Sequence, residues 1–213
     1  MIKIRNPGVE SLRSNPAYRL VLEIGFHDMI PFVLKNIRAK GIMSLAYLIV
    51  NIIMLGFIAF QIVSGVWNHT LTFGGFLSQS IAGILGGSIL VIPLHEIIHG
   101  LAYKLLGAKK IIFGADLQQF VFFVTADRHP VSGLQIYFLA LLPFLAINLI
   151  TFSMILLLFP DLLLFCSFFL LSHNLMCIGD FAITNYVHRA KNRLYSFDEP
   201  KEKKSYFYEM VKN

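Results

Sequence analysis

The stretch Pro93-Leu94-His95-Glu96-Ile97-Ile98-His99-Gly100 places an HExxH motif inside a long apolar segment. Histidines four residues apart lie on one face of a helix, so both imidazoles can bind one zinc ion, and Glu96 can contact the water that completes the coordination. An ionised side chain at the centre of a membrane-spanning helix costs about 2.5 to 3.5 kcal/mol on insertion scales. This cost favours a catalytic metal site over a buried histidine pair that only packs within a bundle.

The composition of the 213-residue chain is that of a membrane protein. Hydrophobic residues make up 56% of it, charged residues 14%, and the mean hydropathy is +0.69. The net charge is +6 and the pI is about 9.4, but the basic residues cluster beside apolar segments. Positively charged loops in the cytoplasm explain this clustering better than a nucleic-acid surface does. The composition therefore predicts a multi-pass protein of the cell membrane, in contact with the lipid bilayer, and no nucleic-acid partner.

Four apolar segments are each long enough to cross a hydrocarbon core of about 30 Å as a helix. They cover about residues 42–66, 77–106, 134–159 and 162–187. The fold class expected is an all-α polytopic membrane protein with about four transmembrane helices. The expected division is a cytoplasmic or interfacial region at 1–40, a four-span metallopeptidase-like domain at 41–188 and a basic cytoplasmic tail at 189–213.

Two regions outside these spans have their own patterns. Residues 18–40 mix apolar and charged side chains, which is consistent with an interfacial amphipathic helix broken near Pro31 or with an ordinary cytosolic tail. Residues 107–133 contain two β-rich runs, 111–113 and 120–125, that predict a short β-hairpin or re-entrant element. Its edge strand could pair with an extended substrate, and the alternative is a plain loop at the membrane surface.

The distribution of Lys and Arg predicts the orientation of the spans. The amino-terminal region, the hairpin region and the carboxy-terminal tail are basic, whereas the two remaining loops have no Lys or Arg. Both termini are therefore expected in the cytoplasm. The second and fourth helices then run in the same direction, and residues equally far from their cytoplasmic ends lie at equal depth.

Asp180 is the candidate for the third protein ligand that a catalytic zinc needs. It lies within about one helical turn of the depth of the two motif histidines. Cys166, His173 and Cys177 fall near the same face of the fourth span, and Cys177 and His173 remain alternative ligands. Asp180 is preferred because a buried unpaired carboxylate needs a metal more than a thiol or an imidazole does. Asn174 is a candidate for supporting a ligand, for donating to a substrate carbonyl, or for packing.

Taken together, the segment from His95 to Gly100 in one span and the segment from Asn174 to Asp180 in a later one resemble a bacterial family of zincin peptidases. That family looks like a distant relative of the site-2 intramembrane metalloproteases. The resemblance implies a zinc peptidase that cuts within or beside a membrane, with His95, His99 and Asp180 as ligands and Glu96 as the base. Site-2 proteases usually have Asp before Gly, whereas Gly179 precedes Asp180 here.

The function expected is a zinc-dependent endopeptidase whose substrate is a membrane-protein or membrane-adjacent peptide. Two alternatives remain. One is a non-catalytic membrane protein that binds or passes a metal ion, which has no need of Glu96 as a base. The other is an inactive relative that acts as an adaptor, which should tolerate loss of the zinc ligands. The sequence predicts no oligomeric state.

Overall fold

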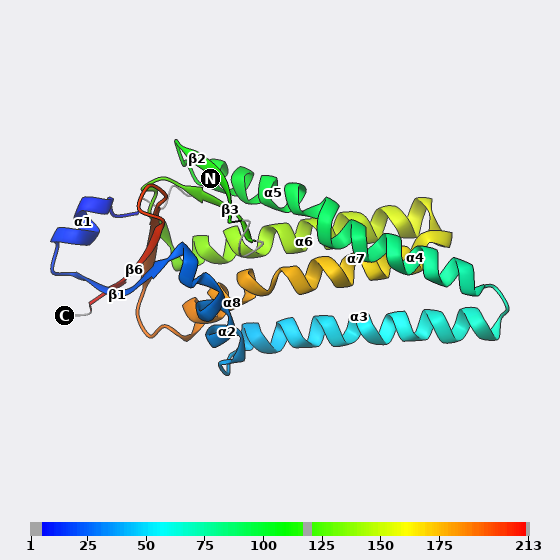
Figure 1. The fold of residues 1–213 in the computed structure, drawn as a ribbon. Helices are drawn as coiled ribbons and strands as arrows, with labels where there is room; N and C mark the ends of the chain where they lie inside the picture. Colours follow the sequence, from blue (N-terminus) through cyan, green and yellow to red (C-terminus); the bar gives the residue numbers. More distant parts are fainter. Residues whose placement is uncertain (1–5, 117–120, 212–213) are drawn as a thin grey trace.

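The computed structural model describes residues 6–116 and 121–211 of the chain. It consists of long helices with a small β-sheet region at one end (Figure 1). Helices account for 66% of the chain. The predicted helical class therefore describes most of the protein, but all-α describes it only roughly, because a four-stranded sheet is present besides the predicted hairpin.

The long helices follow the apolar segments of the sequence. Three continuous helical segments are long and apolar enough to cross a membrane, and they are Ile42–Trp67, Phe73–Leu105 and Gly133–Leu158. A fourth candidate span is a pair of helices bent by 48°. The helices are α3 (Ile42–Trp67), α4 (Phe73–Leu85), α5 (Val91–Leu105), α6 (Gly133–Leu158), α7 (Leu163–Met176) and α8 (Ile178–Arg189).

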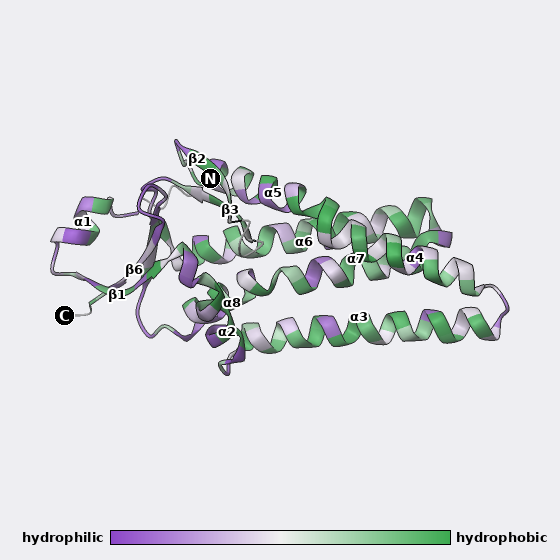
Figure 2. Ribbon diagram, in the orientation of Figure 1, coloured by the Kyte–Doolittle hydropathy of each residue, from purple (hydrophilic) through white to green (hydrophobic). Residues whose placement is uncertain are grey.

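The outer surface of these helices is apolar. Figure 2 shows hydrophobic residues along their whole length, and polar colouring concentrated at the end that carries the sheet. The side chains of Ile53, Phe60 and Leu157 are 64%, 66% and 78% exposed. Apolar surface on this scale is unfavourable in water, which indicates that the chain associates with a membrane.

Two glycines let the motif-bearing segment pack closely against α7. A Cβ atom at Gly83 would lie 2.5 Å from the carbonyl oxygen of Phe165, and one at Gly87 would lie 2.0 Å from that of Phe169. A π-helical turn at Gly86–Leu90 joins α4 to α5, so the two helices form one segment with an irregular turn just before the HExxH motif. Such turns are frequent at functional sites.

The predicted fourth span is bent at Cys177, and it is not one straight helix. Helix α7 ends at Met176 and α8 begins at Ile178. Between them the Cys177 amide still donates to the carbonyl oxygen of His173 over 3.2 Å. The bend places Asp180 in the first turn of α8. Spacing alone could not show it, because neither proline nor a charged run marks the position.

The four-stranded sheet joins the two ends of the chain in the antiparallel order β1-β6-β5-β4. The sequence of residues 18–40 is consistent with an interfacial helix or a cytosolic tail, but the first part of this region is strand β1, which pairs with β6 near residue 210. The predicted break at Pro31 is also wrong, because Pro31 lies in the first turn of α2, where its missing N–H leaves no helical bond unmade. These elements are β1 (Tyr18–Gly25), β4 (Val131–Ser132), β5 (Leu194–Glu199), β6 (Lys204–Met210), α1 (Val9–Ser14) and α2 (Met29–Arg38).

The predicted hairpin between the second and third spans is present. Strands β2 (Ile111–Asp116) and β3 (Val121–Ala126) pair in antiparallel register. The hairpin packs on α5, where a Cβ atom at Gly100 would lie 2.9 Å from the ring of Phe113. The glycine that ends the motif stretch therefore brings the hairpin close to the helix that carries His95 and His99.

Candidate metal centre

Three of the predicted site residues meet at one point between α5 and α8. The Nε2 atoms of His95 and His99 lie 3.0 Å apart. The carboxylate oxygens of Asp180 lie 3.2 Å from His95 Nε2 and 3.4 Å from His99 Nε2. All three side chains are largely buried, with 13%, 15% and 16% of their surface exposed.

These distances fit a zinc ion. In a tetrahedral site with ligand bonds of about 2.0 to 2.1 Å, neighbouring ligand atoms lie about 3.3 Å apart. His99 Nδ1 lies 3.0 Å from the carbonyl oxygen of Leu139, which can only accept, so Nδ1 carries the proton and Nε2 presents a lone pair. A lone pair that faces the carboxylate of Asp180 over 3.4 Å is favourable only with a cation or a proton between them. The donor set therefore fits a resident zinc.

A proline on α6 makes the Leu139 carbonyl available to His99. In a regular helix the amide of residue 143 donates to the carbonyl of residue 139. Pro143 lies inside α6 and has no N–H, so the Leu139 oxygen has no such donor. His99 takes this place over 3.0 Å. A carbonyl partner of this kind fixes the orientation and tautomer of a metal-binding histidine.

The two alternative ligands lie on the other side of His95. His173 Nε2 is 3.1 Å from His95 Nδ1, and Cys177 Sγ is 3.6 Å from the same His173 nitrogen. His95, His173 and Cys177 form a second group whose ligand atoms lie within 4.8 Å of one another. His95 therefore meets Asp180 and His99 through Nε2, and His173 through Nδ1.

Two further residues named from the sequence, Cys166 and Asn174, belong to neither group of potential ligand atoms. Cys166 packs in an apolar cluster with Val91 and Leu170. Asn174 is fully buried, and its Oδ1 accepts a hydrogen bond of 2.7 Å from Asn148. Neither is among the residues that line the cavity at the metal centre, and a role of Asn174 in supporting a ligand or in contacting a substrate stays a prediction.

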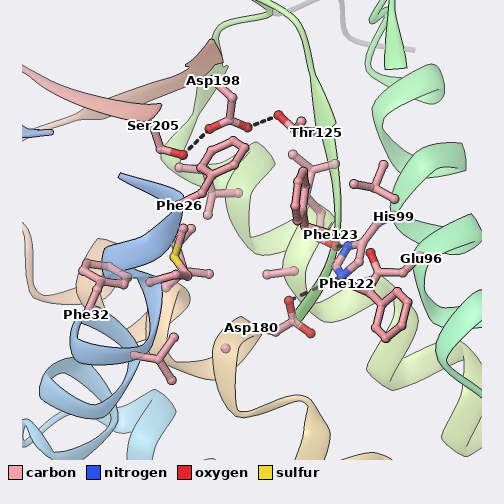
Figure 3. A pocket seen from close by; sticks show the side chains of 18 of the residues that line it. Phe26, Phe32, Glu96, His99, Phe122, Phe123, Thr125, Asp180, Asp198 and Ser205 are labelled. Atoms are coloured by element: carbon pink, nitrogen blue, oxygen red, sulfur yellow. Dashed lines mark hydrogen bonds and ion pairs between the residues drawn. The ribbon is translucent and has the colours of Figure 1, made fainter. Parts of the chain in front are cut away.

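A cavity of about 520 Å³ opens next to the histidines. Figure 3 shows Glu96, His99 and Asp180 at one end of it. Glu96 follows His95 on α5 and lines the same cavity. A carboxylate in this place can take a proton from a water molecule that reaches the three candidate ligand side chains.

The far end of the cavity contains polar residues that sequence reasoning missed. Thr125 of β3, Asp198 of β5 and Ser205 of β6 line it, and both hydroxyls donate to the Asp198 carboxylate. Burial raises the pKa of Asp198, although these two hydrogen bonds act in the opposite direction. The alternation of aromatic and polar residues at 195–198 and the aromatic run at 206–208 are the signals that could have predicted strands in the basic tail.

Comparison with known proteins gives one match. A family model described as "Putative zincin peptidase" matches residues 88–195, a range that contains the HExxH motif, the hairpin and Asp180. No curated protein and no solved structure matches the chain. The resemblance to site-2 intramembrane proteases therefore stays a prediction.

Proposed function

The chain belongs to the family described as "Putative zincin peptidase", and from this membership we propose that it is a zinc-dependent endopeptidase that cuts peptides within or beside a membrane. The observation that carries the proposal is the convergence of His95, His99 and Asp180, with nitrogen-to-oxygen distances of 3.2 and 3.4 Å. In the proposal these three residues hold the zinc and Glu96 is the catalytic base. His173 contacts His95 at Nδ1, Cys177 contacts His173, and the two residues orient the His95 ring.

Each of these side chains has a separate role in the proposed reaction. When bound, zinc polarises the carbonyl group of the peptide bond to be cut and lowers the pKa of a zinc-bound water to about 7. Glu96 accepts the proton of that water and later donates it to the leaving nitrogen. The Leu139 carbonyl holds His99 in the tautomer that leaves Nε2 free. The apolar walls of the cavity exclude bulk water, which strengthens these electrostatic interactions.

Strand β3 is the proposed docking edge for the substrate. Phe122, Val124 and Thr125 of this strand line the cavity that contains Glu96. A peptide that adds to the strand edge in extended form gains backbone hydrogen bonds whatever its sequence. The carbonyl group of the bond to be cut then lies near the zinc ligands. The substrate class we propose is a membrane-protein segment, or a peptide adjacent to the membrane, that can unwind into an extended conformation.

The decisive experiment is metal content by mass spectrometry on detergent-purified protein. We expect about one zinc per native chain, with loss of zinc in His95→Ala and Asp180→Ala. Glu96→Gln should keep the zinc and lose about 10²- to 10⁴-fold in peptide cleavage. Zinc that is indifferent to His95 would contradict the proposal. Zinc binding with cleavage unaffected by Glu96→Gln would favour a protein that binds or passes metal.

A further inference from the structure

Asp198 is a buried carboxylate that has no basic partner among the described residues. Its two oxygens accept from the hydroxyls of Thr125 and Ser205, the latter over 2.6 Å. None of the ion pairs of residues 6–116 and 121–211 includes it. A carboxylate has about four acceptor positions, so two of them remain for a ligand.

The cations around Asp198 are already paired with other acids. Lys204 contacts Glu23 over 2.6 Å, and Lys110 contacts Asp127 over 2.7 Å. Arg128 pairs with Glu10 and lies 3.5 Å from Glu199. In the described chain Arg128 meets Asp198 through backbone atoms, with the Arg128 amide donating to the Asp198 carbonyl over 2.9 Å. Each neighbouring acid thus has a cation, and Asp198 faces the cavity without one.

Aromatic rings line the cavity beside Asp198. Phe26 and Phe123 pack edge to face with their ring centres 5.0 Å apart, and Phe197 precedes Asp198 on β5. All three line the cavity. In Figure 3 the rings of Phe26 and Phe123 lie between Asp198 at one end and Asp180 at the other. A carboxylate next to aromatic faces is suited to a cation, because rings attract positive charge and apolar walls strengthen the ion pair.

Strand β3 connects this end of the cavity to the metal centre. Phe122 lies at the end near Glu96 and His99, and Thr125 lies at the end where it bonds to Asp198 (Figure 3). The two residues are three positions apart, which is about 10 Å of extended strand. A peptide paired with β3, with its cleaved bond at the metal, would carry a side chain to Asp198 about three residues away.

We propose that Asp198 is a specificity site that binds the cationic side chain of a substrate lysine or arginine about three residues from the cleaved bond. The ammonium or guanidinium group donates to the two free acceptor positions of Asp198, and its aliphatic stem lies against Phe26 and Phe123. This inference rests on the proposed peptidase function, because it names a preference of the same cavity. The inference adds that the protein selects substrates by one basic residue of the peptide.

The test compares peptides that differ only in charge. Acetylated and amidated peptides, so that no terminal amine competes, carry lysine or its uncharged analogue norleucine at each position within four residues of the cleaved bond. Cleavage is measured with full-length detergent-purified native protein, Asp198→Asn and the matched control Asp161→Asn. Asp161 is exposed in the turn after α6 and does not line the cavity.

We expect the native protein to prefer lysine by about tenfold to a hundredfold in kcat/KM at one position, as for a charge-assisted hydrogen bond. A shift of the lysine by one residue should remove the preference, because successive side chains of a strand point to opposite sides. Asp198→Asn should cleave the lysine and norleucine peptides equally, whereas Asp161→Asn should keep the preference. Equal use of both peptides by native protein, or a preference that survives in Asp198→Asn, would overturn the inference.

A binding measurement separates this inference from the proposed function. Fluorescence anisotropy of labelled peptides with Glu96→Gln protein reports lysine preference without any cleavage. Preference in binding with no cleavage by native protein would support the Asp198 site and contradict the peptidase proposal. Cleavage by native protein, with no lysine preference in either measurement, would support the peptidase proposal and contradict the Asp198 site. Both comparisons use chains with Asp198 intact, so an absence of lysine preference overturns the inference even if Asp198→Asn fails to fold.

Discussion

His95 Nδ1 lies 3.1 Å from His173 Nε2, and the His173 side chain is fully buried. This contact orients the first histidine of the motif while its Nε2 atom faces Asp180 and His99. Loss of a hydrogen-bond partner behind a metal ligand typically lowers metal affinity about 10- to 100-fold. We therefore expect His173→Phe to bind zinc at the native stoichiometry but with an affinity lower by that factor.

The measurement is a competition titration with a chromophoric zinc chelator. Cys177→Ser is the matched variant, because Cys177 lies 3.6 Å from His173 and is not one of the three proposed zinc ligands. If His173 is itself a ligand in place of Asp180, His173→Phe will lose stoichiometric zinc and Asp180→Ala will keep it.

Pro143 supports His99 through the carbonyl of Leu139. Pro143→Ala restores an amide that can donate to the Leu139 oxygen, in competition with His99 Nδ1 at 3.0 Å. Because a carbonyl has two lone pairs, the competition is partial, and we expect zinc affinity to fall by about tenfold or less. Thermal stability should be unchanged or higher, since proline in a helix interior costs about 3 kcal/mol. A fall in zinc affinity that accompanies unfolding would contradict this explanation.

Gly87 sets the distance between the segment before the motif and α7. In Gly87→Ala the new methyl group would lie 2.0 Å from the Phe169 carbonyl oxygen, so the helices must separate. We expect a loss of about 1 to 3 kcal/mol in the free energy of unfolding, as in other overpacked sites. Gly56→Ala on α3 is the control, because nothing lies within 4 Å of its Cβ position. Equal stability of the two variants in detergent unfolding would show that the close approach is not required.

The features that the sequence predicted correctly have local signals. The long helices follow apolar runs, and the hairpin follows two β-rich runs with charged residues on either side of them. Helical spacing predicts that His95 and His99 share a face. Equal depth in two helices that run in the same direction favours Asp180 as the third ligand. In the structure its carboxylate lies within 3.4 Å of both imidazoles, and its role as a ligand stays a prediction.

The features that were missed depend on distant parts of the chain. Strand β1 pairs with β6, in a register that joins Tyr18 to Met210, and no local pattern encodes a partner so far along the sequence. The cavity end at Asp198 combines residues of β3, β5 and β6. The bend at Cys177 is likewise decided by packing between helices, which overrides the regular spacing that suggested one straight span.

Asp198 should make stability depend on pH in a defined direction. Its pKa in the folded protein is raised above the ordinary value of 3.8 by burial, so the folded state binds the proton more tightly than the unfolded chain. The folded state is therefore favoured below the unfolded pKa, and this contribution is lost as pH rises through the folded pKa. We expect native protein to lose stability relative to Asp198→Asn as the pH rises from about 4. Parallel unfolding curves of the two proteins across this range would contradict the expectation.

The sheet end of the molecule should face the cytoplasm. Of the two loops at the opposite end, 68–72 and 159–162, neither contains Lys or Arg, and such asymmetry sets the orientation of membrane proteins. The two native cysteines are buried, so single introduced cysteines can report topology. An impermeant maleimide should label Asn68→Cys in intact cells and label Ser14→Cys only after the membrane is opened. The reverse pattern would place the sheet and the Asp198 end of the cavity outside the cell, and substrates would then have to approach from that side.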